Sequence, residues 1–320
     1  MRSLYVGRVV LARRSRPTNH HAKNGLTAPT SFPSSRISSP GGTGRGSVEC
    51  ADRQRAQPAW FNWEGWSSMD VRFLGAHGVE LAGVIDLPET EPTSYAVIAH
   101  CFTCHKSYHA VTRIARALNA AGIAVLRFDF AGLGQSAGRF TESTFSADVD
   151  DLVAACAWMG EQGRPVELLV GHSLGGTAAL AAAGRVASLR AVVTVASPSH
   201  PSFVAKRLAE QVRTIGEDGV VQAIVAGRQM LIGAPLIEDL NAQDDYRERV
   251  RSLPVPLLVM HSPDDGVVDI NNAHEIYRLA PMPKSFIAMD SADHLLSKPT
   301  IGQWVGGIVA AWAGKYIFLK

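Results

Sequence analysis

One serine in the chain has neighbours that suit a nucleophile. Ser173 lies in the run VELLVGHSLGG, residues 166–176, between Gly171 and Gly175. The branched aliphatic residues before it favour a short buried strand, and the small residues of TAALAAAGRV after it favour a helix. A serine at such a sharp strand-to-helix turn presents its hydroxyl, and the flanking glycines let the backbone fold back on itself. The pattern therefore predicts a nucleophilic serine rather than an ordinary turn.

A histidine and an acid are needed to activate that serine. A base must accept the hydroxyl proton, and an acid must hold the base in the correct tautomer. With the serine on this kind of turn, the expected order along the chain is serine, acid, histidine. Only His274 and His294 follow the turn at Pro263. His274 falls within an expected helix, whereas His294 follows the last expected strand in MDSADHLL, so we predict His294 as the base.

Three aspartates compete for the role of the acid. Asp264, Asp265 and Asp269 follow the expected strand that contains Met260. We predict Asp265, because it lies at the tip of the turn. Asp269 is expected to cap the next helix, and Asp264 is the main alternative.

Two backbone N–H groups are expected to stabilise a tetrahedral oxyanion. One belongs to Leu174, directly after the serine, and the other is expected in the loop after the strand YAVIAH, where Phe102 is the best candidate. Each such donor is typically worth ~3 kcal/mol of transition-state stabilisation. The predicted site therefore consists of Ser173, Asp265 and His294 with an oxyanion hole of Phe102 and Leu174.

The same loop contains a C-x-x-C motif, Cys101 to Cys104, with histidines nearby. Such a motif occurs in redox pairs and in zinc sites. There is no second C-x-x-C, so we predict buried structural thiols, with redox sensing and metal binding as alternatives. Four scattered cysteines do not suggest a disulfide framework and favour a reducing compartment, and we predict a cytoplasmic protein.

The elements around these residues alternate in type. Expected strands at 95–100, 124–130, 166–170, 191–197, 256–262 and 284–290 alternate with helical patterns after a β-hairpin at 71–87. This order predicts one α/β domain with a mostly parallel sheet flanked by helices. Residues 198–253 interrupt it with two expected helices, Val204–Val212 and Val220–Leu231. We interpret this insertion as a small helical lid, with plain crossover helices as the alternative.

The first 68 residues differ in composition from the rest. They carry ten Lys and Arg against three acidic residues, whereas the remainder of the chain has a net charge of −5. We expect residues 1–68 to be a disordered tail or the product of a wrong start site before Met69, and an organellar transit peptide is the alternative. The folded domain is then 69–320. No stretch offers 18 uninterrupted apolar residues, so no membrane span is expected.

Several segments together resemble a known family. AHCFTCHKS, VLRFDFAGLGQSAG, GHSLGG, MHSPDDGVVDINNAHEIY and KSFIAMDSADHLLS resemble the α/β-hydrolase domain that in many bacteria is joined to an OsmC-like peroxide-reductase domain. The resemblance covers about Met69 to Tyr316 and implies the α/β-hydrolase fold with Ser173 as nucleophile, Asp265 as acid and His294 as base. The chain ends at Lys320, so we expect no OsmC domain here. His100-Cys101 replaces the His-Gly of many esterases, which leaves the shape of the oxyanion hole open.

These residues predict a serine hydrolase that cleaves small or medium carboxylic esters through an acyl-enzyme. An acyltransferase, a peptidase or a C–C hydrolase could use the same residues, and a non-catalytic receptor or a thiol redox protein are alternatives of another class. The loop AGLGQSAG, residues 131–138, lacks the full pattern of a phosphate or dinucleotide site. We therefore expect a small-molecule substrate and no cofactor, metal or nucleic acid. The oligomeric state is not indicated.

Overall fold

The fold is built on one large sheet. The computed structural model describes residues 67–215, 220–225 and 228–318. The sheet has the strand order β1-β2-β4-β3-β5-β6-β10-β11. Its strands are β1 (Ser67–Leu74), β2 (Glu80–Leu87), β3 (Ser94–Ala99), β4 (Ile123–Phe128), β5 (Val166–His172), β6 (Ala191–Val195), β10 (Leu257–His261) and β11 (Lys284–Ala288). In this sheet β4, β3, β5, β6, β10 and β11 run parallel to one another, and only the β1–β2 and β2–β4 pairs are antiparallel.

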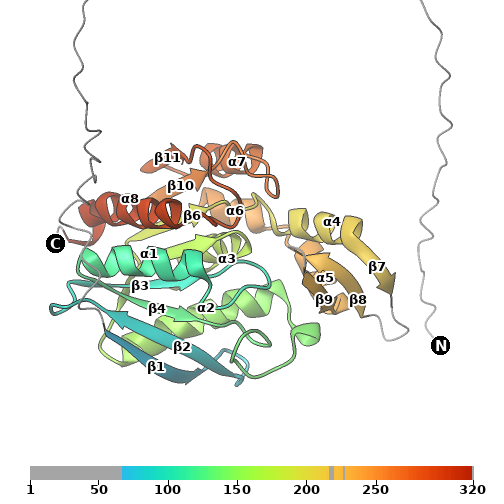
Figure 1. Ribbon diagram of the computed structural model, residues 1–320, viewed down its shortest axis with the longest axis horizontal. Helices are drawn as coiled ribbons and strands as arrows, with labels where there is room; N and C mark the ends of the chain where they lie inside the picture. The colour runs from blue at the N-terminus through green and yellow to red at the C-terminus, as the bar shows by residue number, and fades with distance from the viewer. Residues whose placement is uncertain (1–66, 216–219, 226–227, 319–320) are drawn as a thin grey trace, which may run out of the picture. The chain divides into compact units, whose positions relative to one another are not determined.

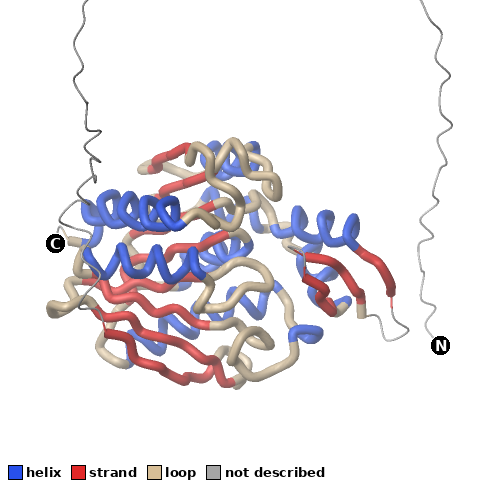
Figure 2. Tube along the Cα trace, in the orientation of Figure 1, coloured by secondary structure: helices blue, strands red, loops and turns tan. Residues whose placement is uncertain are grey.

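Helices cover both faces of this sheet (Figures 1 and 2). They are α1 (His109–Ala120), α2 (Phe145–Glu161), α3 (Leu174–Ala182), α7 (Asn271–Leu279) and α8 (Pro299–Ile317). Alternate residues of one strand enter different cores: Val97 packs in the core that contains α2 and α3, and Ile98 in the core that contains α1 and α8. Because the central strands are buried on both faces, their sequences are continuous apolar runs. The predicted α/β-hydrolase architecture, with its mostly parallel sheet flanked by helices, is confirmed.

Parallel strands bring the predicted chemistry to one edge of the sheet. The loops that hold Phe102, Ser173, Asp265 and His294 follow the carboxyl ends of β3, β5, β10 and β11. In open α/β sheets ligands bind outside this edge. The topology alone therefore gathers residues that lie up to 192 positions apart in the chain.

The insertion between β6 and β10 differs from the sequence prediction. A helix expected at Val204–Val212 is present as α4 (Pro201–Gln211), but the helix expected at Val220–Leu231 is wrong. That segment forms β8 (Val221–Val225) and β9 (Arg228–Ile232), which pair with β7 (Val212–Ile215) in a second, antiparallel sheet. Two helices, α5 (Ala234–Asn241) and α6 (Tyr246–Arg251), complete the insertion.

The error has a simple physical origin. Val221 and Ala223 are buried, whereas Gln222 and Ile224 are more exposed, which is the period-two burial of a strand. A short apolar run fits a helix or a strand equally well by spacing alone. The insertion packs against η2 (Phe140–Glu142) and the start of α2, where Asp239 accepts hydrogen bonds from the N–H and the hydroxyl of Ser146. Its role as a lid stays a prediction.

The predicted tail, 1–68, lies outside the described residues except for its last two positions, which begin β1. No helix in the described ranges is long and apolar enough to cross a membrane.

Candidate active site

The backbone at Ser173 has a conformation that few residues adopt. Its φ is 54° and its ψ is −125°, between the end of β5 and the start of α3. The Ser173 N–H donates to the carbonyl of Val195 (2.9 Å), which ties the turn to β6. A Cβ at Gly171 would overlap the backbone of Gly175, so a side chain does not fit where the strand meets the helix. The strained turn holds the serine hydroxyl at the edge of the sheet.

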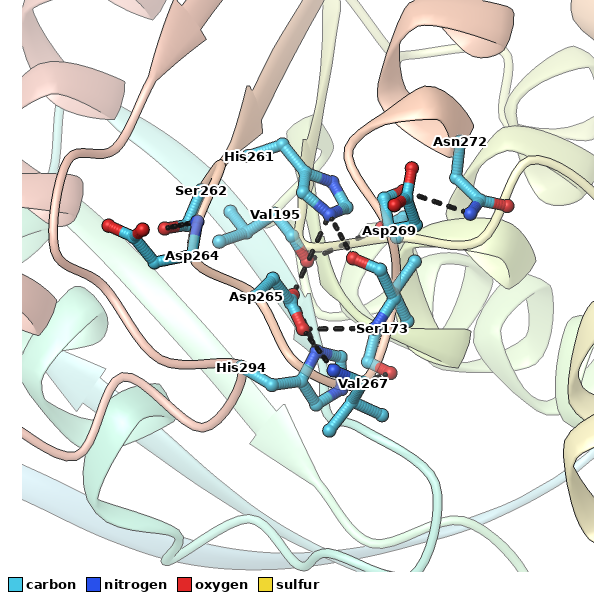
Figure 3. A network of polar contacts seen from close by, with 12 residues as sticks. Ser173, Val195, His261, Ser262, Asp264, Asp265, Val267, Asp269, Asn272 and His294 are labelled. Carbon is cyan, nitrogen blue, oxygen red and sulfur yellow. Dashed lines mark hydrogen bonds and ion pairs between the residues drawn. The ribbon is translucent and has the colours of Figure 1, made fainter. Parts of the chain in front are cut away.

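The structure places three predicted side chains in one hydrogen-bonded chain (Figure 3). His294 Nε2 lies 3.0 Å from Ser173 Oγ, and His294 Nδ1 lies 2.8 Å from Asp265 Oδ2. All three residues are at least 90% buried. With Nδ1–H donating to the carboxylate, Nε2 is left as the acceptor for the serine proton.

The Asp265 carboxylate is held by three donors. Its Oδ1 accepts from the N–H groups of Val267 (2.8 Å) and Val268 (2.9 Å), while Oδ2 accepts from His294. Burial alone would raise the pKa of Asp265, but the hydrogen bond and charge of His294 and the two N–H donors outweigh it and lower the pKa below its usual value. The acid is therefore ionised at neutral pH and can stabilise a protonated His294.

The competing residues have other partners. Asp264 Oδ2 accepts from the Ser291 N–H (3.0 Å), and Asp269 Oδ1 accepts from the Asn271 N–H (2.8 Å) at the start of α7. Asp269 thus acts on the helix start as predicted, although the residue that directly precedes the helix is Ile270. His274 lies on α7, with its ring centroid 5.4 Å from that of Phe286. Neither aspartate nor His274 is hydrogen-bonded to the serine or to His294.

The two predicted oxyanion residues line the same small pocket. Leu174 is the first residue of α3, and the first N–H groups of a helix have no partner within it. The Phe102 N–H donates to no other described residue. Neither N–H group is thus committed to a partner among the described residues.

Sequence reasoning missed a group of buried histidines around these residues. His172 Nε2 lies 2.7 Å from the carbonyl oxygen of His294, and His261 Nε2 lies 2.8 Å from that of Val268. Burial lowers the pKa of His172 to about 3 and also lowers the pKa of His261. Both rings are therefore neutral at neutral pH and donate Nε2–H to these carbonyls. They position the loops that hold His294 and Asp265, and no local sequence signal marks them.

The loop between β3 and α1, residues 100–108, is called the oxyanion loop after the role proposed for Phe102, and a buried ion pair attaches it to the fold. Lys106 Nζ lies 2.6 Å from Asp129 Oδ2, and the Lys106 N–H also donates to this carboxylate. Burial would raise the pKa of Asp129, but its hydrogen bonds and the Lys106 charge lower it. Gln135 donates its N–H to the same carboxylate, so the loop 131–138 and the oxyanion loop share one anchor.

The prediction of free thiols in the oxyanion loop is wrong. Cys101 and Cys104 form a disulfide, and only Cys156 is a free thiol among the described residues. The Cys104 N–H donates to the Cys101 carbonyl (3.0 Å), and this turn brings the two Cα atoms to 5.3 Å, within the usual range for a disulfide. The low cysteine count could not reveal this pairing, because it depends on the loop conformation. In the described ranges no three or more His, Cys, Asp or Glu side chains are grouped as metal ligands.

The fold and the site define a hydrolase of the α/β type. Residues 96–317 match the model of the alpha/beta hydrolase family, and the chain belongs to that family.

Individual relatives agree with this assignment. A crystal structure of the esterase domain of a Rhodothermus marinus protein is 40% identical, with a TM-score of 0.66 over 78% of this chain and 99% of that one. The monoacylglycerol lipase of Mycolicibacterium smegmatis is 24% identical over 62% of this chain and 79% of its own length. The uncharacterized protein YfhR of Escherichia coli K12 is 23% identical over 72% of this chain and 74% of its own length. The chain is thus esterase-like.

Proposed function

We propose that the protein is a serine hydrolase that cleaves carboxylic esters through an acyl-enzyme. The observation that carries the proposal is the continuous hydrogen-bonded chain from Ser173 Oγ through His294 to Asp265, with spacings of 3.0 and 2.8 Å. The esterase domain that is 40% identical to this chain supports the same substrate class.

The proposed reaction uses this geometry. Ser173 Oγ attacks the ester carbonyl carbon while His294 Nε2 accepts the hydroxyl proton, and Asp265 stabilises the resulting imidazolium. The carbonyl oxygen becomes an oxyanion that accepts hydrogen bonds from the N–H groups of Phe102 and Leu174. The intermediate then expels the alcohol, which takes the proton from His294. Water, deprotonated by the same histidine, releases the acid from the serine.

The size of the acyl group, the acyl acceptor and the cellular location are also part of this proposal. The pocket beside the oxyanion residues is small and largely apolar, which favours small or medium acyl groups. An acyltransferase would use the same residues with another acceptor in place of water. The specific resemblance to OsmC-linked hydrolases and a cytoplasmic location stay predictions.

Turnover of p-nitrophenyl esters tests the proposal. The wild-type protein is expected to hydrolyse p-nitrophenyl acetate and butyrate faster than palmitate. Ser173→Ala is expected to reduce kcat/KM by at least about 10³-fold, because the nucleophile is lost. Ser68→Ala, at an exposed serine on the edge strand β1, is the matched control and should retain wild-type rates.

Other outcomes separate the alternatives. Binding without turnover would indicate a receptor and contradict the proposal. Peroxide consumption that survives Ser173→Ala but is lost in Cys104→Ser would indicate a thiol redox protein instead.

A further inference from the structure

The pocket beside the proposed oxyanion donors contains a carboxyl group that the hydrolytic reaction does not use. Three aromatic side chains, Phe102, Phe130 and Phe140, line it together with Leu174 and Asp148. The Phe102 and Phe140 ring centroids lie 5.6 Å apart. Because Phe102, Leu174 and Asp148 line the same pocket, a substrate whose carbonyl oxygen reaches the Phe102 and Leu174 N–H groups can extend one of its ends toward Asp148.

Asp148 differs from the acidic residues around it in having no partner. It lies near the start of α2, where the helix dipole favours a negative charge modestly. Its carboxyl makes no hydrogen bond or ion pair with any described residue. Asp151, by contrast, accepts from the Ala131 N–H (3.3 Å), and Asp239 is held by Ser146. Asp148 also remains partly accessible, so a ligand can reach it.

The two charged groups that shift the pKa of Asp148 are both carboxylates. Burial, and then the carboxylates of Asp151 and Asp239, raise the pKa of Asp148 well above its usual value. The pocket lining includes no Lys or Arg, and burial lowers the pKa of its histidine, His100, to about 4, so that ring is neutral at neutral pH. The protein thus supplies no positive charge within the pocket to offset the carboxyl.

Aromatic rings and a carboxyl group without a partner favour the same kind of ligand, a cation. The face of an aromatic ring attracts ammonium groups, and the attraction grows where water is excluded. A cation in the pocket would favour the ionised form of Asp148 and relieve its repulsion by Asp151 and Asp239. A neutral alkyl group of the same shape would bury the carboxyl without compensation, which costs free energy.

We propose that Asp148 determines substrate specificity by favouring esters that carry an ammonium group on their acyl or alcohol part. The proposal rests on the proposed ester hydrolysis and names the substrate class of that site. The positive group would sit between Asp148 and the aromatic side chains while the ester carbonyl faces Ser173.

Two pairs of matched esters test this proposal. The acyl pair is the p-nitrophenyl esters of 4-(trimethylammonio)butyrate and of its neutral isostere 5,5-dimethylhexanoate. The alcohol pair is acetylthiocholine and its neutral isostere S-(3,3-dimethylbutyl) thioacetate, followed by thiol release. In at least one pair, wild-type kcat/KM is expected to be about tenfold or more higher for the cationic ester. The pair that shows the preference identifies which part of the substrate enters the pocket.

Variants then assign the preference to one residue. Asp148→Asn keeps the shape of the side chain and is expected to reduce the cationic-to-neutral ratio about tenfold. Asp150→Asn is the matched control, because Asp150 lies on the same helix but pairs with Arg185 (2.6 Å) and should keep the wild-type ratio.

The outcomes distinguish this inference from the proposed function. Hydrolysis of the neutral esters with a ratio near one, or lower, in both pairs would overturn the inference and leave the hydrolase proposal standing. A preference that persists in Asp148→Asn would also overturn it. If no ester is hydrolysed, the hydrolase proposal fails first. Because the wild-type ratio needs no variant, it can overturn the inference even if Asp148→Asn does not fold.

Discussion

Acidification is expected to destabilise this fold because histidines are buried in neutral form beside the site. His172 is 1% exposed, and its pKa falls from 6.5 to about 3 on folding. Below pH 6.5 the unfolded chain binds a proton at this ring while the folded chain does not, so the free energy of unfolding falls as the pH falls. The loss begins near pH 6.5 and is complete near pH 3, where the folded protein also binds the proton.

The magnitude follows from these two values. Between pH 7 and pH 5 the unfolded ring goes from mostly neutral to almost fully protonated, while the folded ring stays neutral. The resulting loss is about 2 kcal/mol for His172 alone. Burial likewise lowers the pKa of His100 to about 4, so this ring is expected to contribute a similar loss over the same interval.

Urea unfolding at pH 7 and pH 5 measures this effect, with wild type compared to His172→Gln. Other titrating groups contribute almost equally to both proteins, so the difference in pH dependence isolates His172. The variant is expected to lose about 2 kcal/mol less than wild type between the two pH values. Glutamine can still donate to the His294 carbonyl, which limits other damage to the loop. Equal pH dependence in the two proteins would refute the idea that His172 is buried in neutral form.

Three further variants test other parts of the site. Asp265→Asn is expected to lower kcat for p-nitrophenyl acetate about 10³- to 10⁴-fold with little change in stability, and a near-normal kcat would contradict the role of this acid. Gly171→Ala is expected to lower the melting temperature by several degrees, because its Cβ would overlap the backbone of Gly175 in the strand-to-helix turn. Gly184→Ala, with open space around its Cβ, should not lower it. Equal melting temperatures for the two variants would show that the turn can adjust. The Cys101→Ala/Cys104→Ala double variant should lower kcat by less than about 100-fold and change KM less, because the disulfide encloses a proposed oxyanion donor. Unchanged kinetics would show that the loop keeps its conformation without the disulfide.

The sequence was sufficient to locate the proposed reactive residues because their signals are local. Ser173 is marked by its glycines, and Asp265 and His294 by their positions after expected strands. His172, inside the same GHSLGG motif, was not recognised, because its partner is the carbonyl of residue 294, which lies 122 positions away. Long-range backbone contacts of this kind leave no pattern in the sequence.

The two wrong predictions, a helix at 220–231 and free thiols at Cys101 and Cys104, concern features that depend on contacts beyond the local sequence. The β8–β9 hairpin was read as a helix because a short apolar run has no decisive period, and only pairing with β7 selects the strand. The Cys101–Cys104 disulfide depends on a turn in the oxyanion loop. The main sheet was predictable because each of its strands is an apolar run bounded by turn residues.

Ser173 is expected to become acylated during ester cleavage. A p-nitrophenyl phosphonate should react irreversibly with an activated serine: Oγ bonds to phosphorus, p-nitrophenolate leaves, and the adduct mimics the tetrahedral intermediate. Mass spectrometry of the digested protein locates the adduct. We expect one adduct per chain on the peptide that contains Ser173. Ser173→Ala should form no adduct, and His294→Ala should form it at a strongly reduced rate. Stoichiometric labelling of any other residue, or undiminished ester turnover after Ser173 is replaced, would contradict the assignment of the nucleophile.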